Sequence, residues 1–482
     1  MQERVPELEL DDMQGLIGRG YAELRAASYM LLRIDDPASA RSWLGRVAEE
    51  VTPASARPED AALNVAITAS GVQQLGLSPR LFSNEFRTGM TTPRRRRALG
   101  DLGDSAPERW LWGGPDTPRI DLLLLVFGRD AATLDQRRAS LAGSVGDSGV
   151  SEVLTLETAV DLDGKEHFGF ADGISQPTIA GLSSRADIPP NTIRSGEFIL
   201  GYPNEYGRYT ARPLLEPSAD PDRLLPQDVE GSGQADFGRN GTYLVFRQLS
   251  QDVRGFWRFV DQAARGTGRP EDRAWLAAKM VGRWPSGAPL TLAGDADDPM
   301  LATANDFTYQ YADPFGLQCP VGAHVRRAHP RDSLDPDPGT VRSVALDKRH
   351  RLLRRGREYG PPVDDVLAPA PPDDPDRGLY FICLIGNIAR QFEFVQHTWL
   401  NNPKFAGLYD EPDPLVANHA LGAATFSVPA DPVRLRYTGL STFVSVRGGG
   451  YFFLPGLRAL RYLAATAAGW RQPGNTSSPV GS

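Results

Sequence analysis

The first 160 residues contain short apolar runs and longer segments in which apolar residues recur every three or four positions. Apolar runs predict strands, and the three-to-four spacing predicts amphipathic helices. The expected strands are 28–34, 63–68, 120–127 and 150–160, the expected helices are 38–51 and 130–141, and Ser70 is the expected cap of a short helix. Two β-α-β units provide too few parallel crossovers for a barrel. We therefore predict a ferredoxin-like α+β fold, an antiparallel sheet with helices on one face.

The second half of the chain repeats this pattern. A strand rich in aromatic and β-branched residues runs directly into a helix twice. These pairs are 241–248 with 251–265 and 379–386 with 389–401; further strands are expected within 443–454 and a helix near 459–468. Two proline-rich, acidic segments, 212–237 and 361–377, are expected to be long loops that either link elements or border a site. The small polar tail, 473–482, is expected to be disordered.

Charge and cysteine content exclude several classes of protein. The 482 residues include 52 basic and 60 acidic side chains, a net charge of −8, so we expect no nucleic-acid partner. Two cysteines, Cys319 and Cys383, provide no disulfide framework. The N-terminus shows no signal-peptide pattern, and the most apolar run, 379–389, is shorter than the roughly 20 residues of a membrane helix. We therefore expect a cytoplasmic protein without a membrane span.

The six histidines are densest in the segment 319–331, CPVGAHVRRAHPR. Cys319, His324 and His329 are separated by four residues each, a spacing that matches no zinc template. A single histidine here could instead bind a haem iron from one side. The spacing alone does not identify the ligand.

Two other segments contain candidate catalytic side chains. Asp172 lies in FGFADGISQP, where Asp-Gly is a typical turn but a carboxylate among apolar residues could also serve as an acid or base. The basic run HRLLRRGREYG, 350–360, is either a solvated surface or the source of one inward arginine that meets an anion.

Together these segments resemble the dye-decolorizing haem peroxidases. Gly169 to Gly173 matches the GxxDG motif of that family, 319–331 resembles its proximal histidine segment, and 350–360 resembles its distal arginine segment. The resemblance extends from about residue 10 to 457, and the length is similar to that of the larger bacterial branch. One departure is His329, where the family pattern AHxRxxNPR has asparagine.

The resemblance implies two ferredoxin-like domains, 1–185 with the GxxDG motif and 186–472 with the haem site, in the barrel-like dimeric α+β superfamily. It also implies one non-covalent haem b per chain, and no Cys-x-x-Cys-His is present for covalent attachment. His324 would be the axial iron ligand and Asp172 the acid-base group, with activity best in mildly acidic conditions. Arg354 would stabilise charge on the leaving oxygen, with Arg355 as the competing choice.

Further residues around the haem follow from the same resemblance. Haem propionates need cations, for which Arg247, Arg326, Arg327 and Arg194 are candidates. Leu379, Phe381 and Phe392 are candidates for the apolar pocket wall or are ordinary core residues. Glu393 is one candidate acceptor for the second nitrogen of His324.

The implied function is a peroxidase that uses hydrogen peroxide to oxidise dyes and phenolic or other aromatic compounds through a ferryl intermediate, with bulky reductants oxidised at a surface Trp or Tyr. Mn²⁺ is a further candidate reductant, at Asp220 with Asp222 or at Asp373, Asp374 and Asp376. The alternatives are a haem-handling protein, similar to a deferrochelatase or haem carrier, and a binding module with an emptied site. The oligomeric state stays open.

Overall fold

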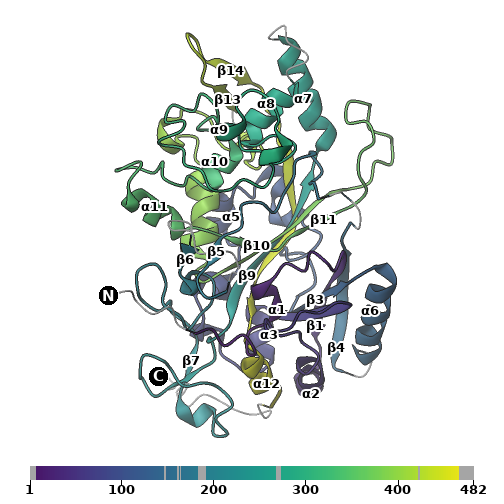
Figure 1. The fold of residues 1–482 in the computed structure, drawn as a ribbon. Helices are drawn as coiled ribbons and strands as arrows, with labels where there is room; N and C mark the ends of the chain where they lie inside the picture. Colours follow the sequence, from purple (N-terminus) through teal and green to yellow (C-terminus); the bar gives the residue numbers. More distant parts are fainter. Residues whose placement is uncertain are drawn as a thin grey trace, which may run out of the picture.

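The computed structural model describes residues 7–145, 148–159, 162, 164–182, 192–266, 273–421 and 424–465. Its centre is one nine-stranded antiparallel sheet, of which Figure 1 labels β1, β3, β4, β9, β10 and β11. The strand order is β10-β12-β9-β15-β2-β3-β1-β4, and β11 also pairs with β12. The sheet consists of an N-terminal half of four strands and a C-terminal half of five, which meet where β15 pairs with β2 through Phe453 and Ile67.

The N-terminal half has the ferredoxin-like order β4-β1-β3-β2. Its elements are β1 (Ala26–Ile34), α2 (Pro37–Ala48), β2 (Ala61–Ile67), β3 (Leu122–Gly128), α6 (Ala131–Val145) and β4 (Val150–Glu157). Helix α2 begins after Asp36, whose side chain accepts a hydrogen bond from the Ser39 amide at 2.8 Å, with Pro37 in the first helical turn. The short helix after β2 is capped by Thr68 and not by Ser70, because the Thr68 hydroxyl accepts the Gly71 amide.

The C-terminal half repeats this order as β15-β9-β12 followed by β10 and β11. Its elements are β9 (Thr242–Gln251), α7 (Val253–Gly266), β10 (Leu353–Arg354), β11 (Arg357–Tyr359), β12 (Gly378–Ile385), the π-helical turns η8 (Ala389–Glu393) and η9 (Val395–Leu400), and β15 (Val444–Leu454). The expected strands within 443–454 are one strand, which continues through Gly448–Gly450 after a register shift.

The two halves pack against each other face to face. The Tyr29 ring of β1 lies 5.6 Å from Phe246 of β9 and 5.7 Å from Tyr380 of β12, measured between ring centroids. In a flat sheet β1 and β9 would be four strand spacings apart, about 19 Å. The sheet therefore curves until its inner faces share one core, as in a barrel-like α+β fold. The fold predicted from the sequence is confirmed.

The remaining elements are short. The other α-helices are α1 (Gly15–Gly18), α3 (Ala69–Gln74), α4 (Asn84–Thr88), α5 (Pro93–Leu99), α8 (Arg273–Val281), α9 (Leu290–Ala293), α10 (His324–Ala328), α11 (Val341–Lys348) and α12 (Leu457–Ala465). The single-turn helices are η1 (Pro79–Leu81), η2 (Gly103–Ser105), η3 (Pro107–Arg109), η4 (Ser195–Glu197), η5 (Pro217–Ala219), η7 (Pro299–Leu301), η10 (Phe405–Gly407) and η11 (His419–Leu421). The other strands are β5 (Thr178–Ile179), β6 (Thr192–Ile193), β7 (Leu214–Leu215), β8 (Ala235–Asp236), β13 (Thr425–Val428) and β14 (Leu435–Thr438).

The predictions about loops, membrane spans, the domain boundary and the tail are compared with the structure only as far as the described residues extend. The segment 212–237 contains η5 and the antiparallel pair of two-residue strands β7 and β8, whereas 361–377 contains no regular element. No helix of the described residues combines the length and apolarity needed to cross a bilayer. The domain boundary at 185/186 and the tail 473–482 lie outside the described residues.

Candidate active site

A large pocket opens on one face of the C-terminal half-sheet. It encloses about 1860 Å³ including its mouth. Alternate residues of three neighbouring strands form one wall, because side chains two positions apart point to the same face. These residues are Arg247, Leu249 and Gln251 of β9, Leu379 and Phe381 of β12, and Val444 and Val446 of β15. The predicted apolar residues Leu379, Phe381 and Phe392 all line this pocket.

His324 lines the pocket from the first residue of α10. Its Nδ1 lies 2.9 Å from Oδ2 of Asp413, whose side chain is completely buried. The other oxygen of Asp413 accepts the amides of Leu415 and Val416, each at 2.9 Å, which fixes the carboxylate. This leaves Nε2 of His324 as the nitrogen available to a ligand in the pocket.

The contact between His324 and Asp413 also shifts the pKa values of both groups. Burial alone would lower the pKa of His324 and raise that of Asp413, but their attraction and shared hydrogen bond reverse both directions.

Because Asp413 binds Nδ1 of His324, the prediction that Glu393 is the acceptor for this nitrogen is wrong. Glu393 binds Arg95 at 2.7 Å and accepts the Tyr451 hydroxyl at 2.9 Å.

Asp172 and Arg354 meet in the same pocket. Nη1 of Arg354 donates to Oδ1 of Asp172 at 2.7 Å. The Arg354 side chain is 29% exposed and the Asp172 side chain 34%, and both line the pocket. Burial raises the pKa of Asp172, but Arg354 and the Gly173 amide outweigh it and hold the pKa below its ordinary value. Asp172 in turn raises the pKa of Arg354. Asp172 is therefore ionised at neutral pH and Arg354 is charged.

Gln176 explains why this aspartate and this arginine come together. Its Oε1 accepts the Arg354 amide at 3.1 Å, and its Nε2 donates to the Arg354 carbonyl at 3.2 Å. The loop of Asp172 is thereby tied to strand β10 of the sheet edge. Arg355 points elsewhere, because it donates to the carbonyls of Leu16 and Ile17 at 2.8 and 3.0 Å.

Two buried arginines give part of the pocket wall a positive charge. Arg283 donates to the carbonyls of Gly287 and Ala304 and to the Ser175 hydroxyl, and no carboxylate of the described residues forms an ion pair with it. Arg351 contacts Nε2 of His329 at 2.7 Å, and its nearest carboxylate, that of Asp347, is 3.8 Å away. Burial lowers the pKa of both guanidinium groups to about 10, and both still carry charge at neutral pH. Sequence reasoning identified neither residue.

The four predicted cations have different surroundings. Arg247 lines the pocket but forms a buried ion pair with Asp101. Arg326 is outside the pocket, because it binds Asp313 at 3.3 Å and the Cys319 carbonyl at 2.7 Å. Arg327 is buried and donates to backbone carbonyls, among them that of Asn402 at 3.2 Å. Arg194 precedes η4 and does not line the pocket.

The alternative metal sites find no support. Among the residues that the structure describes, no three His, Cys, Asp or Glu side chains converge to hold a metal ion. His329 is buried, and burial lowers its pKa to about 3, so the imidazole is neutral. Asp220 accepts the amides of Leu224 and Leu225, and Asp374 pairs with Arg254 and Arg377.

Comparisons with known proteins agree on one group. The dye-decolorizing peroxidase of Exidia glandulosa is 31% identical over 485 residues, which cover 95% of this chain and 88% of that protein. The multifunctional dye peroxidase DyP2 of an Amycolatopsis species is 30% identical over 94% of this chain and 96% of its own. No protein-family model matches the chain.

Solved structures show the same likeness. A dye-decolorizing peroxidase from Auricularia auricula-judae superimposes with a TM-score of 0.77 at 26% identity, over 95% of this chain and 100% of that one. A deferrochelatase of Yersinia pestis is 29% identical over 181 residues, 37% of this chain and 27% of that protein.

Proposed function

This chain belongs to the dye-decolorizing peroxidase family, and on that premise we propose that it holds one b-type haem non-covalently on His324 and activates peroxide between Asp172 and Arg354. It is an oxidoreductase, a peroxidase that uses hydrogen peroxide. The observation that carries the proposal is the convergence of these three side chains in one pocket.

The pocket residues fit a haem-type cofactor. His324 offers one nitrogen while Asp413 holds the other, the arrangement that fixes the orientation of a metal-binding imidazole. The apolar wall suits the porphyrin ring. Arg283 and Arg351 suit its propionate carboxylates, because both are charged and, in the part of the chain that the structure describes, neither has a carboxylate within 3.5 Å. When bound, the haem iron supplies the redox chemistry that cleaves the peroxide bond.

Asp172 is the group that moves the peroxide proton. Since it is ionised, it can accept the proton of the inner oxygen and deliver it to the outer oxygen, which then leaves as water. Arg354 keeps its charge throughout and stabilises negative charge on the leaving oxygen. Their 2.7 Å ion pair keeps both groups positioned before peroxide arrives.

We propose aromatic compounds, dyes and phenols as the electron donors, in line with the names of the relatives. Mn²⁺ lacks comparable support, because Asp374 is engaged by arginines and Asp220 by backbone amides. Bulky donors would transfer electrons through the protein surface.

The test is reconstitution with hemin, followed by absorption spectra before and after one equivalent of peroxide. The parent should show a Soret band that peroxide changes and a phenol or dye restores, and His324→Ala should lose the native band. A parent protein that peroxide only bleaches would refute the proposal. Release of metal-free porphyrin would instead support the deferrochelatase-like alternative, which the partial match to that enzyme raises.

A further inference from the structure

The peroxidase reaction needs more protons than peroxide supplies. Its balance is H2O2 + 2 e⁻ + 2 H⁺ → 2 H2O, so two protons must come from elsewhere in each cycle. Asp172 moves a proton from one peroxide oxygen to the other and adds none. When the donor releases only electrons, the protons must enter the pocket from solvent.

Glu166 is a further carboxyl group in the wall of this pocket, beside Asp172 and the arginine-paired Asp101. Its Oε1 accepts the Phe170 amide at 3.0 Å, and its Oε2 accepts the Phe168 amide at 2.9 Å and Nε2 of Gln251 at 2.8 Å. No arginine or lysine pairs with it among the described residues. The proposed mechanism so far gives this group no role.

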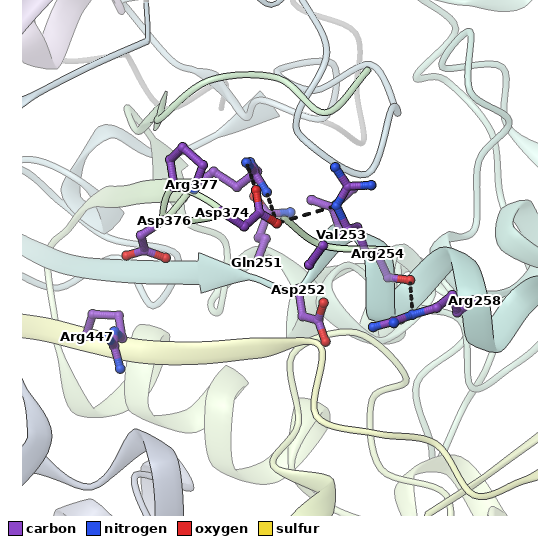
Figure 2. A pocket seen from close by; sticks show the side chains of 11 residues that line it. Gln251, Asp252, Val253, Arg254, Arg258, Asp374, Asp376, Arg377 and Arg447 are labelled. Carbon is purple, nitrogen blue, oxygen red and sulfur yellow. Dashed lines mark hydrogen bonds and ion pairs between the residues drawn. The ribbon is translucent and has the colours of Figure 1, made fainter. Parts of the chain in front are cut away.

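Gln251 connects Glu166 to a second, outer pocket. This outer pocket, lined by Gln251 and by the charged side chains of α7 and of residues 374–377, encloses about 600 Å³ including its open mouth. Figure 2 shows Gln251 among these side chains, with Asp374 bound to Arg254 and Arg377. Gln251 lines both pockets and therefore lies between the outer pocket and the inner one.

The Gln251 amide can bond to either protonation state of Glu166. As placed, its NH2 group donates to the carboxylate, and its Oε1 is buried without a hydrogen-bond partner. Turning the amide by half a rotation would present that oxygen to a protonated Glu166, which needs an acceptor for its O–H group. A buried amide oxygen without a hydrogen-bond partner is uncommon, and the rotated amide would give this oxygen the O–H group of protonated Glu166 as its partner.

We infer that Glu166 and Gln251 form a proton-entry path from the outer pocket to the peroxide side of the haem pocket. The inference rests on the proposed haem site and adds the source of the protons consumed there. A proton reaches Glu166 past the Gln251 amide, and Glu166 passes it through pocket water to the oxygen that is being reduced.

The electrostatics around Glu166 agree with such a role. Burial raises its pKa to about 7, the negative charge of Asp172 acts in the same direction, and the three hydrogen-bond donors oppose it. Its neighbour His167 has a pKa lowered by burial and by Arg377, and its Nε2 donates to the Tyr359 carbonyl at 2.8 Å instead. Glu166 can therefore take a proton from solvent near neutral pH, whereas the lowered pKa of Asp172 keeps that group ionised until peroxide supplies a proton.

The test uses ferrocyanide, which donates electrons without protons, in stopped-flow reactions of the hemin-loaded enzyme. In Glu166→Gln, the peroxide-induced Soret change should keep the parent rate within about twofold, because Asp172 recycles the peroxide proton. The return of the Soret band should slow by about tenfold or more and show a larger solvent deuterium effect, because proton delivery then limits it. Gln251→Leu should show the same split, and Glu166→Asp should recover part of the rate.

Glu358→Gln is the matched control. Glu358 is also a carboxyl group with a raised pKa that interacts with Asp172, but it does not line the pocket. In this variant the Soret band should return at the parent rate. A haem-independent measurement is the infrared spectrum of the haem-free protein, in which a protonated carboxyl band near neutral pH should vanish in Glu166→Gln and persist in Glu358→Gln.

The outcomes separate the two claims. If the parent itself shows no peroxide-induced Soret change, the proposed haem site fails. If the parent does, and Glu166→Gln returns at the parent rate with the parent deuterium effect, the proton path is refuted.

Discussion

The carboxylate behind His324 provides a prediction in which haem binding and folding can be separated. Asp413 holds three hydrogen-bond donors, Nδ1 of His324 and the amides of Leu415 and Val416. Asp413→Asn keeps an oxygen for the two amides but places an NH2 group against Nδ1. The imidazole then favours carrying its proton on Nε2, the nitrogen that must bind iron.

Two variants of Asp413 should differ in how much stability they lose, although both should lose hemin affinity. Loss of the partner behind a metal-binding histidine typically costs about 10- to 100-fold in affinity, or roughly 1.4–2.7 kcal/mol. Asp413→Asn should therefore weaken hemin binding by that factor with little loss of stability. Asp413→Ala should do the same and also leave two buried amides without partners, at about 1–3 kcal/mol each.

The assays are hemin titration followed by the Soret band, and urea unfolding of the haem-free protein. The expected result is similar hemin affinity in both variants, with a lower urea midpoint only for alanine. If Asp413→Asn bound hemin with the parent affinity and the parent spectrum, Asp413 would not orient the iron-binding nitrogen, and the reasoning from its 2.9 Å contact would be wrong.

Three further predictions concern the charges of the pocket. Because the pKa of Asp172 is lowered, the group stays ionised as pH falls, and the rate of the peroxide step should decline only below the ordinary aspartate range; Asp172→Asn should slow that step by about 10²–10⁴-fold and remove the acidic limb in a pH profile. Arg354→Leu removes the largest influence that lowers this pKa, so burial dominates and the acidic limb should move to higher pH, whereas an unmoved limb would show that Arg354 does not set it. Arg283→Met should weaken binding of hemin but not of its dimethyl ester, measured by parallel titrations, and equal weakening of both would exclude a propionate contact.

The order of strands and helices could be predicted from the sequence because each is marked by its own apolar period. Strands β10 and β11 could not, because they have two and three residues and are dominated by charged side chains. Their strand character comes from pairing with the buried β12. Arg354 was therefore identified by resemblance, without the edge strand that positions it.

The residues around His324 show where local reasoning fails. Arg326 was a candidate cation for the haem propionates, but it lies two positions after His324 on one helix, and such residues point in different directions. Asp413 is 89 residues from His324, and no local pattern links them. Arg283 likewise reaches the pocket only through the packing of the segment after α8, so three-dimensional structure was needed to find all of these contacts.

The pairing of β9, β12 and β15 has a consequence for how this pocket can change in evolution. Phe381 lies opposite Arg247, and Leu249 lies between Leu379 and Val446. The spacing of the side chains in this wall is therefore set by the backbone hydrogen bonds between the strands. Deleting one residue from β9 would turn every wall position on that strand to the other face. New substrates can therefore be accommodated by exchanging side chains at these wall positions or by lengthening the loops at the pocket mouth. Insertions or deletions within these three strands should be rare among relatives that keep the activity.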